Sequence, residues 1–203
     1  ITAVHFGADA VYFAGKMYGL RAFAGNFEDD EIVKAMNYLH QHGKKGYVTL
    51  NIVANDSDFK HIDQFLELLV RAKVDGVIVS DTGMIYYIRK NFPSLNVHVS
   101  TQANVNNCYS AKFYADMGVT RIVLARELSL NQIKEIALAV GDKVELEAFV
   151  HGAMCISYSG RCLLSNYMTG RDSNRGACVQ ACRWNYTIRE VNKTEEYPIE
   201  EDE

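Results

Sequence analysis

Apolar and polar positions follow two alternating patterns along the first 150 residues. Short runs that are apolar throughout predict strands buried on both faces, and longer segments with apolar residues every three or four positions predict helices. The predicted strands are 10–13, 47–51, 76–80, 97–100, 121–125 and 144–150, with helices at 28–41, 58–72, 82–91, 105–117 and 129–140. This alternation indicates an α/β protein with a parallel sheet covered by helices.

Polar side chains lie at or just after the end of nearly every predicted strand. They are Asn51, Ser80, Asp81, Ser100, Gln102, Arg126, Glu127, Glu147 and His151. In a (β/α)8 barrel all strand ends converge on one mouth, whereas an open doubly wound sheet concentrates its ligand groups at one switch point. We therefore favour an incomplete (β/α)8 TIM-type barrel over residues 1–151. The chain opens at Ile1 in a helix-like stretch, so we expect the first strand to be missing.

Charge divides the rest of the chain into two segments. The net charge is −4, which argues weakly against nucleic acid, but residues 152–189 carry five arginines and one acid. Residues 190–203 carry seven acids and one lysine. We interpret 152–189 as an appended cysteine-rich, arginine-rich cluster-binding segment and 190–203 as a truncated acidic tail.

No apolar run approaches the ~20 residues that a bilayer-spanning helix needs, and no charged-then-apolar leader opens the chain. We expect a soluble, cytoplasmic protein without a membrane partner. A protein partner or a homo-oligomer is compatible with an incomplete barrel.

Four of the five cysteines lie in the segment 152–189, and they are Cys155, Cys162, Cys178 and Cys182. Cytoplasmic redox conditions disfavour disulfides. Structural zinc sites use tight Cys-x2-4-Cys pairs, and only Cys178 and Cys182 have such spacing. Open spacing favours a larger iron-sulfur cluster. Zinc, and buried thiols without a metal, remain alternatives.

Three residues at the predicted mouth are candidates for catalysis. His151 could act as a base toward Cys155 or Ser157 as nucleophile, but a cysteine that binds a metal cannot attack a substrate. A strand-end histidine bonded to backbone is the simpler interpretation. Glu145 and Glu147 alternate along their strand, so we expect one to point inward and favour Glu147. Its alternative role is an ion pair with Arg126 or another arginine.

The arginines and the loop at 14–27 suggest two kinds of ligand. Arg161, Arg171, Arg175 and Arg183, interleaved with Tyr158, Tyr167, Trp184 and Tyr186, combine phosphate-binding charge with rings that stack on bases. A solvated basic loop is the alternative. In the loop 14–27, Tyr18, Arg21 and Asn26 could contact a small anion over the barrel mouth, although a solvent-exposed loop is the simpler account. Arg21, Asn51 and Gln102 are the expected substrate-binding residues.

Several motifs resemble the peptidase U32 family, and the likeness covers residues 3–186. They are Phe6-Gly-Ala-Asp-Ala-Val-Tyr12, Ser100-Thr-Gln-Ala-Asn104, Arg126-Glu-Leu-Ser129, Glu147-Ala-Phe-Val-His-Gly-Ala-Met-Cys155, Arg161-Cys-Leu-Leu-Ser165 and the Arg-Asp-x-Asn-x-Gly-x-Cys-x3-Cys-Arg-Trp-x-Tyr pattern that ends at Tyr186. Within the family the chain is most similar to the prephenate-dependent tRNA uridine hydroxylation proteins. Other relatives act in ribosomal RNA hydroxylation or ubiquinone synthesis, or are named collagenase-like proteases.

The resemblance implies a barrel with a 4Fe-4S cluster on Cys155, Cys162, Cys178 and Cys182. Some relatives take the fourth ligand from elsewhere, so Cys182 is the ligand that the resemblance supports least. It also implies tRNA as partner, hydroxylation of a wobble uridine as reaction, and the dicarboxylate prephenate as cosubstrate. A peptidase that uses Glu147 and His151, and a noncatalytic scaffold that delivers RNA, are the alternatives.

Overall fold

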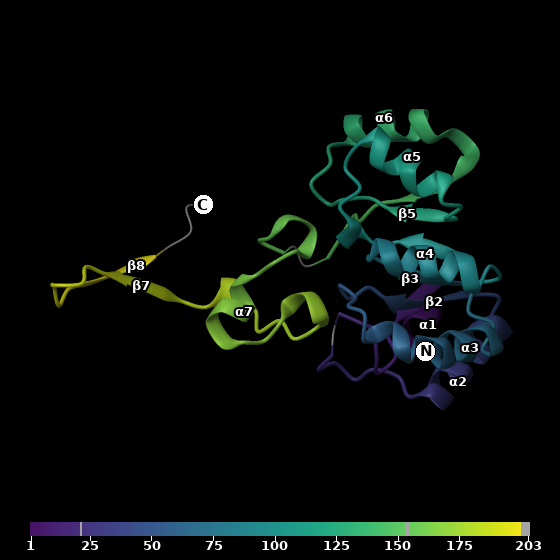
Figure 1. Cartoon of the computed structure of the whole chain (residues 1–203), viewed down its shortest axis with the longest axis horizontal. Coiled ribbons are helices and arrows are strands. Elements are labelled where there is room, and N and C mark those ends of the chain that lie inside the picture. The colour runs from purple at the N-terminus through teal and green to yellow at the C-terminus, as the bar shows by residue number, and fades with distance from the viewer. Residues whose placement is uncertain (21, 153–154, 200–203) are drawn as a thin grey trace.

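Six parallel strands form a single sheet in the order in which they occur along the chain. The computed structural model describes residues 1–20, 22–152 and 155–199. The strands are β1 (Ala10–Phe13), β2 (Lys45–Leu50), β3 (Gly76–Val79), β4 (Val97–Val99), β5 (Arg121–Val123) and β6 (Glu145–Glu147), and each is paired with the next. The sheet is curled and corresponds to an open half-barrel (Figure 1). The six predicted strands are confirmed.

One principal helix lies between each pair of strands, as the apolar periodicity predicts. They are α2 (Asp29–Gln41), α3 (Ile62–Arg71), α4 (Thr82–Asn91), α5 (Cys108–Asp116) and α6 (Leu130–Val140), and the short α1 (Thr2–His5) precedes β1. The helix expected at 58–72 is divided, because the 3-10 turn η1 (Asp58–Lys60) is separated from α3 by His61 at φ −129°. The strand expected at 144–150 is confined to β6.

Side chains between the helices and the outer face of the sheet form the core. Ile32 and Met36 of α2 are fully buried, as are Val48 and Leu50 of β2, which face them from the sheet. Because side chains alternate along a strand, Tyr47 and Thr49 point to the concave face instead. The concave face and the strand ends are therefore where polar groups gather.

The chain after β6 leaves the sheet and continues as short turns and one small helix. These elements are η4 (Tyr158–Gly160), α7 (Leu164–Thr169), η5 (Ser173–Arg175) and η6 (Ala181–Arg183). The antiparallel hairpin of β7 (Tyr186–Arg189) and β8 (Glu196–Ile199) follows and extends away from the sheet (Figure 1). Across the described residues, no helix has the length and apolar character that crossing a membrane would require.

Candidate functional site

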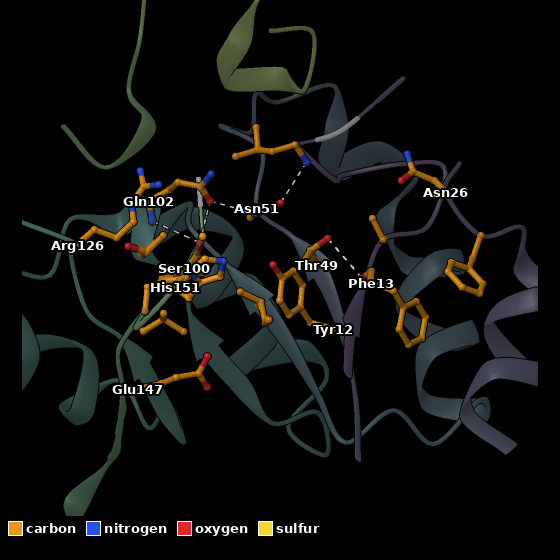
Figure 2. A pocket seen from close by; sticks show the side chains of 18 of the residues that line it. Tyr12, Phe13, Asn26, Thr49, Asn51, Ser100, Gln102, Arg126, Glu147 and His151 are labelled. Atoms are coloured by element: carbon orange, nitrogen blue, oxygen red, sulfur yellow. Dashed lines mark hydrogen bonds between the residues drawn. The ribbon is translucent and has the colours of Figure 1, made fainter. Parts of the chain in front are cut away.

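A cavity of about 490 Å³ opens where the strands end and collects most of the residues that the sequence points to (Figure 2). Asn51, Gln102, Arg126, Glu147 and His151 all line it. They come from positions that follow or end β2, β4, β5 and β6, so parallel strands bring distant sequence positions to one edge. Arg21, the sixth residue expected here, lies outside the described residues.

A relay of hydrogen bonds joins the loop after β1 to the loops after β2 and β4. The Leu20 backbone N–H donates to Asn51 Oδ1 at 3.1 Å, and Asn51 Nδ2 donates to Gln102 Oε1 at 3.0 Å. The Ser100 hydroxyl donates to the same Gln102 oxygen at 2.8 Å. Figure 2 shows the side chains of Asn51, Gln102 and Ser100 with the hydrogen bonds between them. Both polar atoms of the Asn51 side chain are therefore used within the protein.

Aromatic residues line the cavity on the side of β1. They are Tyr12, Phe13 and Phe27, and the Phe13 and Phe27 ring centroids are 4.9 Å apart. The Phe27 N–H donates to the Ala14 carbonyl at 3.0 Å, which folds the loop 14–27 back onto its own start. A mixture of apolar residues and polar strand ends is typical of a small-molecule site.

The two glutamates of β6 point to the same face of the sheet, so the expectation that only one points inward is wrong. Residues two apart along a strand share a face. Arg121 at the start of β5 binds both, with Nε to Glu145 Oε2 at 2.9 Å and Nη1 to Glu147 Oε2 at 3.1 Å. The alternative interpretation of Glu147 as an ion-pair partner is confirmed, with Arg121 as the arginine.

Beneath the cavity lies a polar cluster that the sequence did not reveal. His98 is 5% exposed and packs edge-on against the Tyr47 ring, with centroids 4.6 Å apart. The Arg121 guanidinium lies 5.4 Å from the same ring. Burial, together with the positive charge of Arg121, lowers the pKa of His98 to about 4, so the imidazole is neutral at neutral pH.

The start of the cysteine-rich segment is bound to the loops that follow β4 and β5. Arg161 Nε donates to the Gln102 carbonyl at 3.2 Å. The Ser159 N–H and hydroxyl donate to the two carboxylate oxygens of Glu127 at 2.6 and 2.7 Å, and these bonds lower the pKa of Glu127 against the effect of its burial, which raises it. Ser159 is fully buried and has φ 42°, so these bonds hold it in a left-handed conformation.

Arg175 connects the same segment to the loop after β2. Its two terminal nitrogens donate to the two Asp58 carboxylate oxygens, each at 2.8 Å, and Nη1 also donates to the Val53 carbonyl at 3.0 Å. The hydrogen bond from Arg175 is the largest cause of the lowered pKa of Asp58. This guanidinium, expected to contact RNA, is thus occupied by the protein's own carboxylate.

The other three arginines expected to bind RNA have different surroundings. Arg161 is bonded to the Gln102 backbone, as described above. The Arg171 guanidinium lies 4.4 Å from the centroid of the Phe23 ring, so it packs on the loop 14–27. Arg183, on η6, is exposed and is followed by Trp184, whose surface is 45% exposed.

The four cysteines of the segment are free thiols with polar surroundings. Cys155, Cys178 and Cys182 are exposed, and Cys162 is half-buried. Cys162 and Cys178 each accept a hydrogen bond on sulfur from the backbone N–H two residues later, at 3.3 Å. Hydrogen bonds from backbone N–H groups to sulfur also occur around iron-sulfur clusters. In the described ranges, no three His, Cys, Asp or Glu side chains are grouped closely enough to hold a metal ion.

Comparisons with known proteins bear on this site. The family model described as Peptidase family U32 matches residues 1–203. The "tRNA hydroxylation protein P1" of Bacillus subtilis is 45% identical over 94% of this chain and 44% of its own. The "23S rRNA 5-hydroxycytidine C2501 synthase" of Escherichia coli is 40% identical over 93% of this chain and 28% of its own. The chain therefore spans less than half the length of either relative.

A solved structure shares the fold. The U32 peptidase Mk0906 superposes with a TM-score of 0.60 at 19% sequence identity, over 70% of this chain and 60% of that one. At this identity the likeness concerns the fold alone, and it supports the curled, helix-covered parallel sheet.

Proposed function

Because the chain belongs to the peptidase U32 family, we propose that it takes part in tRNA modification in the cytoplasm, as part of an enzyme that hydroxylates a wobble uridine. The similarity to a relative named for tRNA hydroxylation extends over 94% of the chain, so it includes both the cavity and the cysteine-rich segment. A relative named for hydroxycytidine synthesis in ribosomal RNA supports the same class of reaction. The observation that carries the proposal is that the basic segment is bonded, through Arg161, to Gln102, which lines the cavity.

The cavity is the proposed site for the small cosubstrate. Gln102 and Arg126 line it and can donate hydrogen bonds to carboxylate oxygens, and the apolar residues Tyr12, Leu20 and Ile78 line it as well. These features suit an anion with an apolar body, such as prephenate. In this proposal Arg126 binds the anion, and His151 is placed to hold or release a proton at the rim.

The cysteine-rich segment is the proposed cluster site, with Cys155, Cys162, Cys178 and Cys182 as ligands of a 4Fe-4S group. The support is the thiol-rich composition and the backbone N–H groups already directed at two of the sulfurs. A bound cluster would supply electron transfer or an open iron site. Iron, sulfide and zinc analysis of anaerobically purified protein tests this assignment. If the protein contained zinc and no labile sulfide, the segment would be assigned to a structural zinc site instead of a cluster.

The exposed part of the segment is the proposed tRNA contact. Trp184 and Tyr167 are 45% and 87% exposed, and rings of this kind stack on unpaired bases. Arg183 adds a phosphate-binding charge next to Trp184. With Arg175 occupied by Asp58, we assign the RNA contact to Arg183 and the rings around it.

Mass spectrometry of tRNA nucleosides tests the function. We expect cells that lack the gene, and any redundant pathway, to lose hydroxyuridine and its derivatives. The complete gene should restore them, whereas its Arg126→Gln variant should restore less than about a tenth. Lys34→Gln, an exposed substitution on α2, is the matched control and should restore wild-type levels. Unchanged hydroxyuridine in the deletion strain would contradict the proposal.

Peptide hydrolysis is the second candidate, because the family and the similar structure are named as peptidases. Glu147 and His151 line the cavity and could serve as acid and base. The hydrogen bond from Arg121 occupies one carboxylate oxygen of Glu147 and therefore argues against Glu147 as the acid or base of a peptidase. Collagen or peptide cleavage that a His151→Ala substitution abolishes would favour a peptidase over RNA modification.

A further inference from the structure

The relay at the rim of the cavity has a fixed direction. A backbone N–H can only donate a hydrogen bond, so the Asn51 atom that faces Leu20 N must be the oxygen. The other atom of that amide is then NH2, and it faces Gln102 at 3.0 Å. The Gln102 atom at this contact must therefore be its oxygen, because two NH2 groups cannot bond to each other.

The oxygen of the Gln102 amide is bonded twice. It accepts from Asn51 Nδ2 and from the Ser100 hydroxyl, so the NH2 group points away from both. Among the described residues, no hydrogen bond uses this NH2 as donor, and it does not belong to the buried polar atoms that lack a partner. The NH2 group is therefore accessible on a side chain that lines the cavity.

The backbone around Gln102 is fixed as well. Arg161 Nε binds its carbonyl, and the neighbouring Thr101 hydroxyl donates to the Leu124 carbonyl at 2.9 Å. Gln102 also stands in the 3-10 turn η2 (Thr101–Ala103), which Ser100 caps through the Gln102 N–H. A side chain with a fixed backbone and one bonded amide end presents its other end in one orientation.

We propose that Gln102 determines ligand specificity by donating to an acceptor oxygen, and that Asn51 is a positioning residue that sets this polarity. The ligand group would be a carboxylate or a ring carbonyl, two sources of the same acceptor chemistry. Arg126, on the same cavity, can only donate, so the two side chains favour the same kind of ligand atom. The inference rests on the proposed function only in taking the cavity as the substrate site.

Two substitutions of nearly unchanged size test the direction of the relay. Gln102→Glu keeps an oxygen for Asn51 and Ser100 but presents an anion to the ligand. Asn51→Asp keeps an oxygen for Leu20 N–H but turns its other oxygen toward Gln102, which must then rotate its NH2 to that side. Both variants should therefore remove the donor from the cavity, although only one of them changes Gln102.

Binding of succinate and of uridine to the full-length protein, measured by calorimetry, is the readout. For a carboxylate ligand, each single variant should weaken succinate binding about tenfold or more. For a ring carbonyl, each should weaken uridine binding by that factor instead. No loss in either variant, or no binding of either probe to the wild type, would overturn the proposal.

Folding and function are controlled separately. Thermal unfolding should change little in Gln102→Glu. The neutral variant Gln102→Met removes the donor without adding a charge, so it decides the donor assignment if Asn51→Asp does not fold. The binding assay does not depend on tRNA hydroxylation. Loss of probe binding with normal hydroxyuridine in cells would leave the donor assignment intact and reject the cavity as the reaction site.

Discussion

The bond between Arg175 and Asp58 makes a quantitative prediction about how the cysteine-rich segment is held to the sheet. The pair is bidentate and partly buried, with side chains 35% and 12% exposed, and Arg175 also binds the Val53 carbonyl. Exposed ion pairs contribute at most about 1 kcal/mol, whereas bonds to charged groups removed from water contribute ~1.5–3 kcal/mol. For this intermediate case we expect Asp58→Asn to reduce the free energy of unfolding by ~2 kcal/mol.

Thermal unfolding measures this cost. A loss of ~2 kcal/mol corresponds to a decrease in the melting temperature of about 4–8 °C for a domain of this size. Arg175→Lys keeps the charge but not the two-pronged geometry, so it should lose a large part of the same stability. The matched control is Asp30→Asn, which removes an exposed ion pair with Lys34 and should change the melting temperature by less than about 1 °C.

Hydrogen exchange shows where the stability is lost. The Val53 N–H donates to the Asn174 carbonyl, and the Ala22 N–H donates to the Gly176 carbonyl, so both amides depend on the position of the segment. In Asp58→Asn these two amides should exchange faster, while the Val77 amide, bonded to Asn96 inside the sheet, should not. The reasoning would be refuted if Asp58→Asn changed the exchange rates of all three amides equally. It would also be refuted if Asp30→Asn lowered the melting temperature as much as Asp58→Asn does.

Two further predictions concern the sheet. The pKa of His98 is about 4 in the folded protein and ~6.5 in the unfolded protein, so the unfolded state takes up the proton first as the pH falls. The free energy of unfolding should therefore decrease by roughly 2–3 kcal/mol between pH 6.5 and pH 4. Urea titrations should show that His98→Phe removes this part of the pH dependence. A methyl group on Gly46 would overlap the buried Met36 sulfur, so Gly46→Ala should reduce the free energy of unfolding by ~1–3 kcal/mol in the same assay. The control is Gly25→Ala, which has open space around the new methyl group and should reduce it little. Equal effects of the two substitutions would contradict the close packing of Gly46 against Met36.

The fold was accessible from the sequence because buried parallel strands and amphipathic helices have different apolar periods. Helix starts were less accessible, since α5 begins at Cys108 where the Asn107 side chain accepts from the Tyr109 and Ser110 N–H groups. A shortened strand is equally hard to foresee. Val150 is 99% exposed, so its apolar character did not reflect burial in β6.

The candidate site was predictable where the topology alone decides proximity. Asn51 and Gln102 lie side by side because parallel strands end at one edge of the sheet, and this follows from the topology without knowing which residues contact each other. Asp58 and Arg175 are 117 positions apart, and nothing in a single sequence pairs this acid with this arginine. The shared face of Glu145 and Glu147 was available from the two-residue period of a strand and was misjudged.

The loop 14–27 connects the two proposed centres, and this connection has a thermodynamic consequence. Leu20 in this loop is bonded to Asn51 at the cavity, and Ala22 is bonded to Gly176 in the cysteine-rich segment. A side chain at Gly176 would come within 2.8 Å of the Gly19 carbonyl oxygen, so the two backbones are in direct contact. A ligand that binds at the cavity and restricts the loop also favours the bound position of the segment, and the reverse must hold by linkage. Cosubstrate binding should therefore tighten metal binding by the same factor as the metal tightens cosubstrate binding.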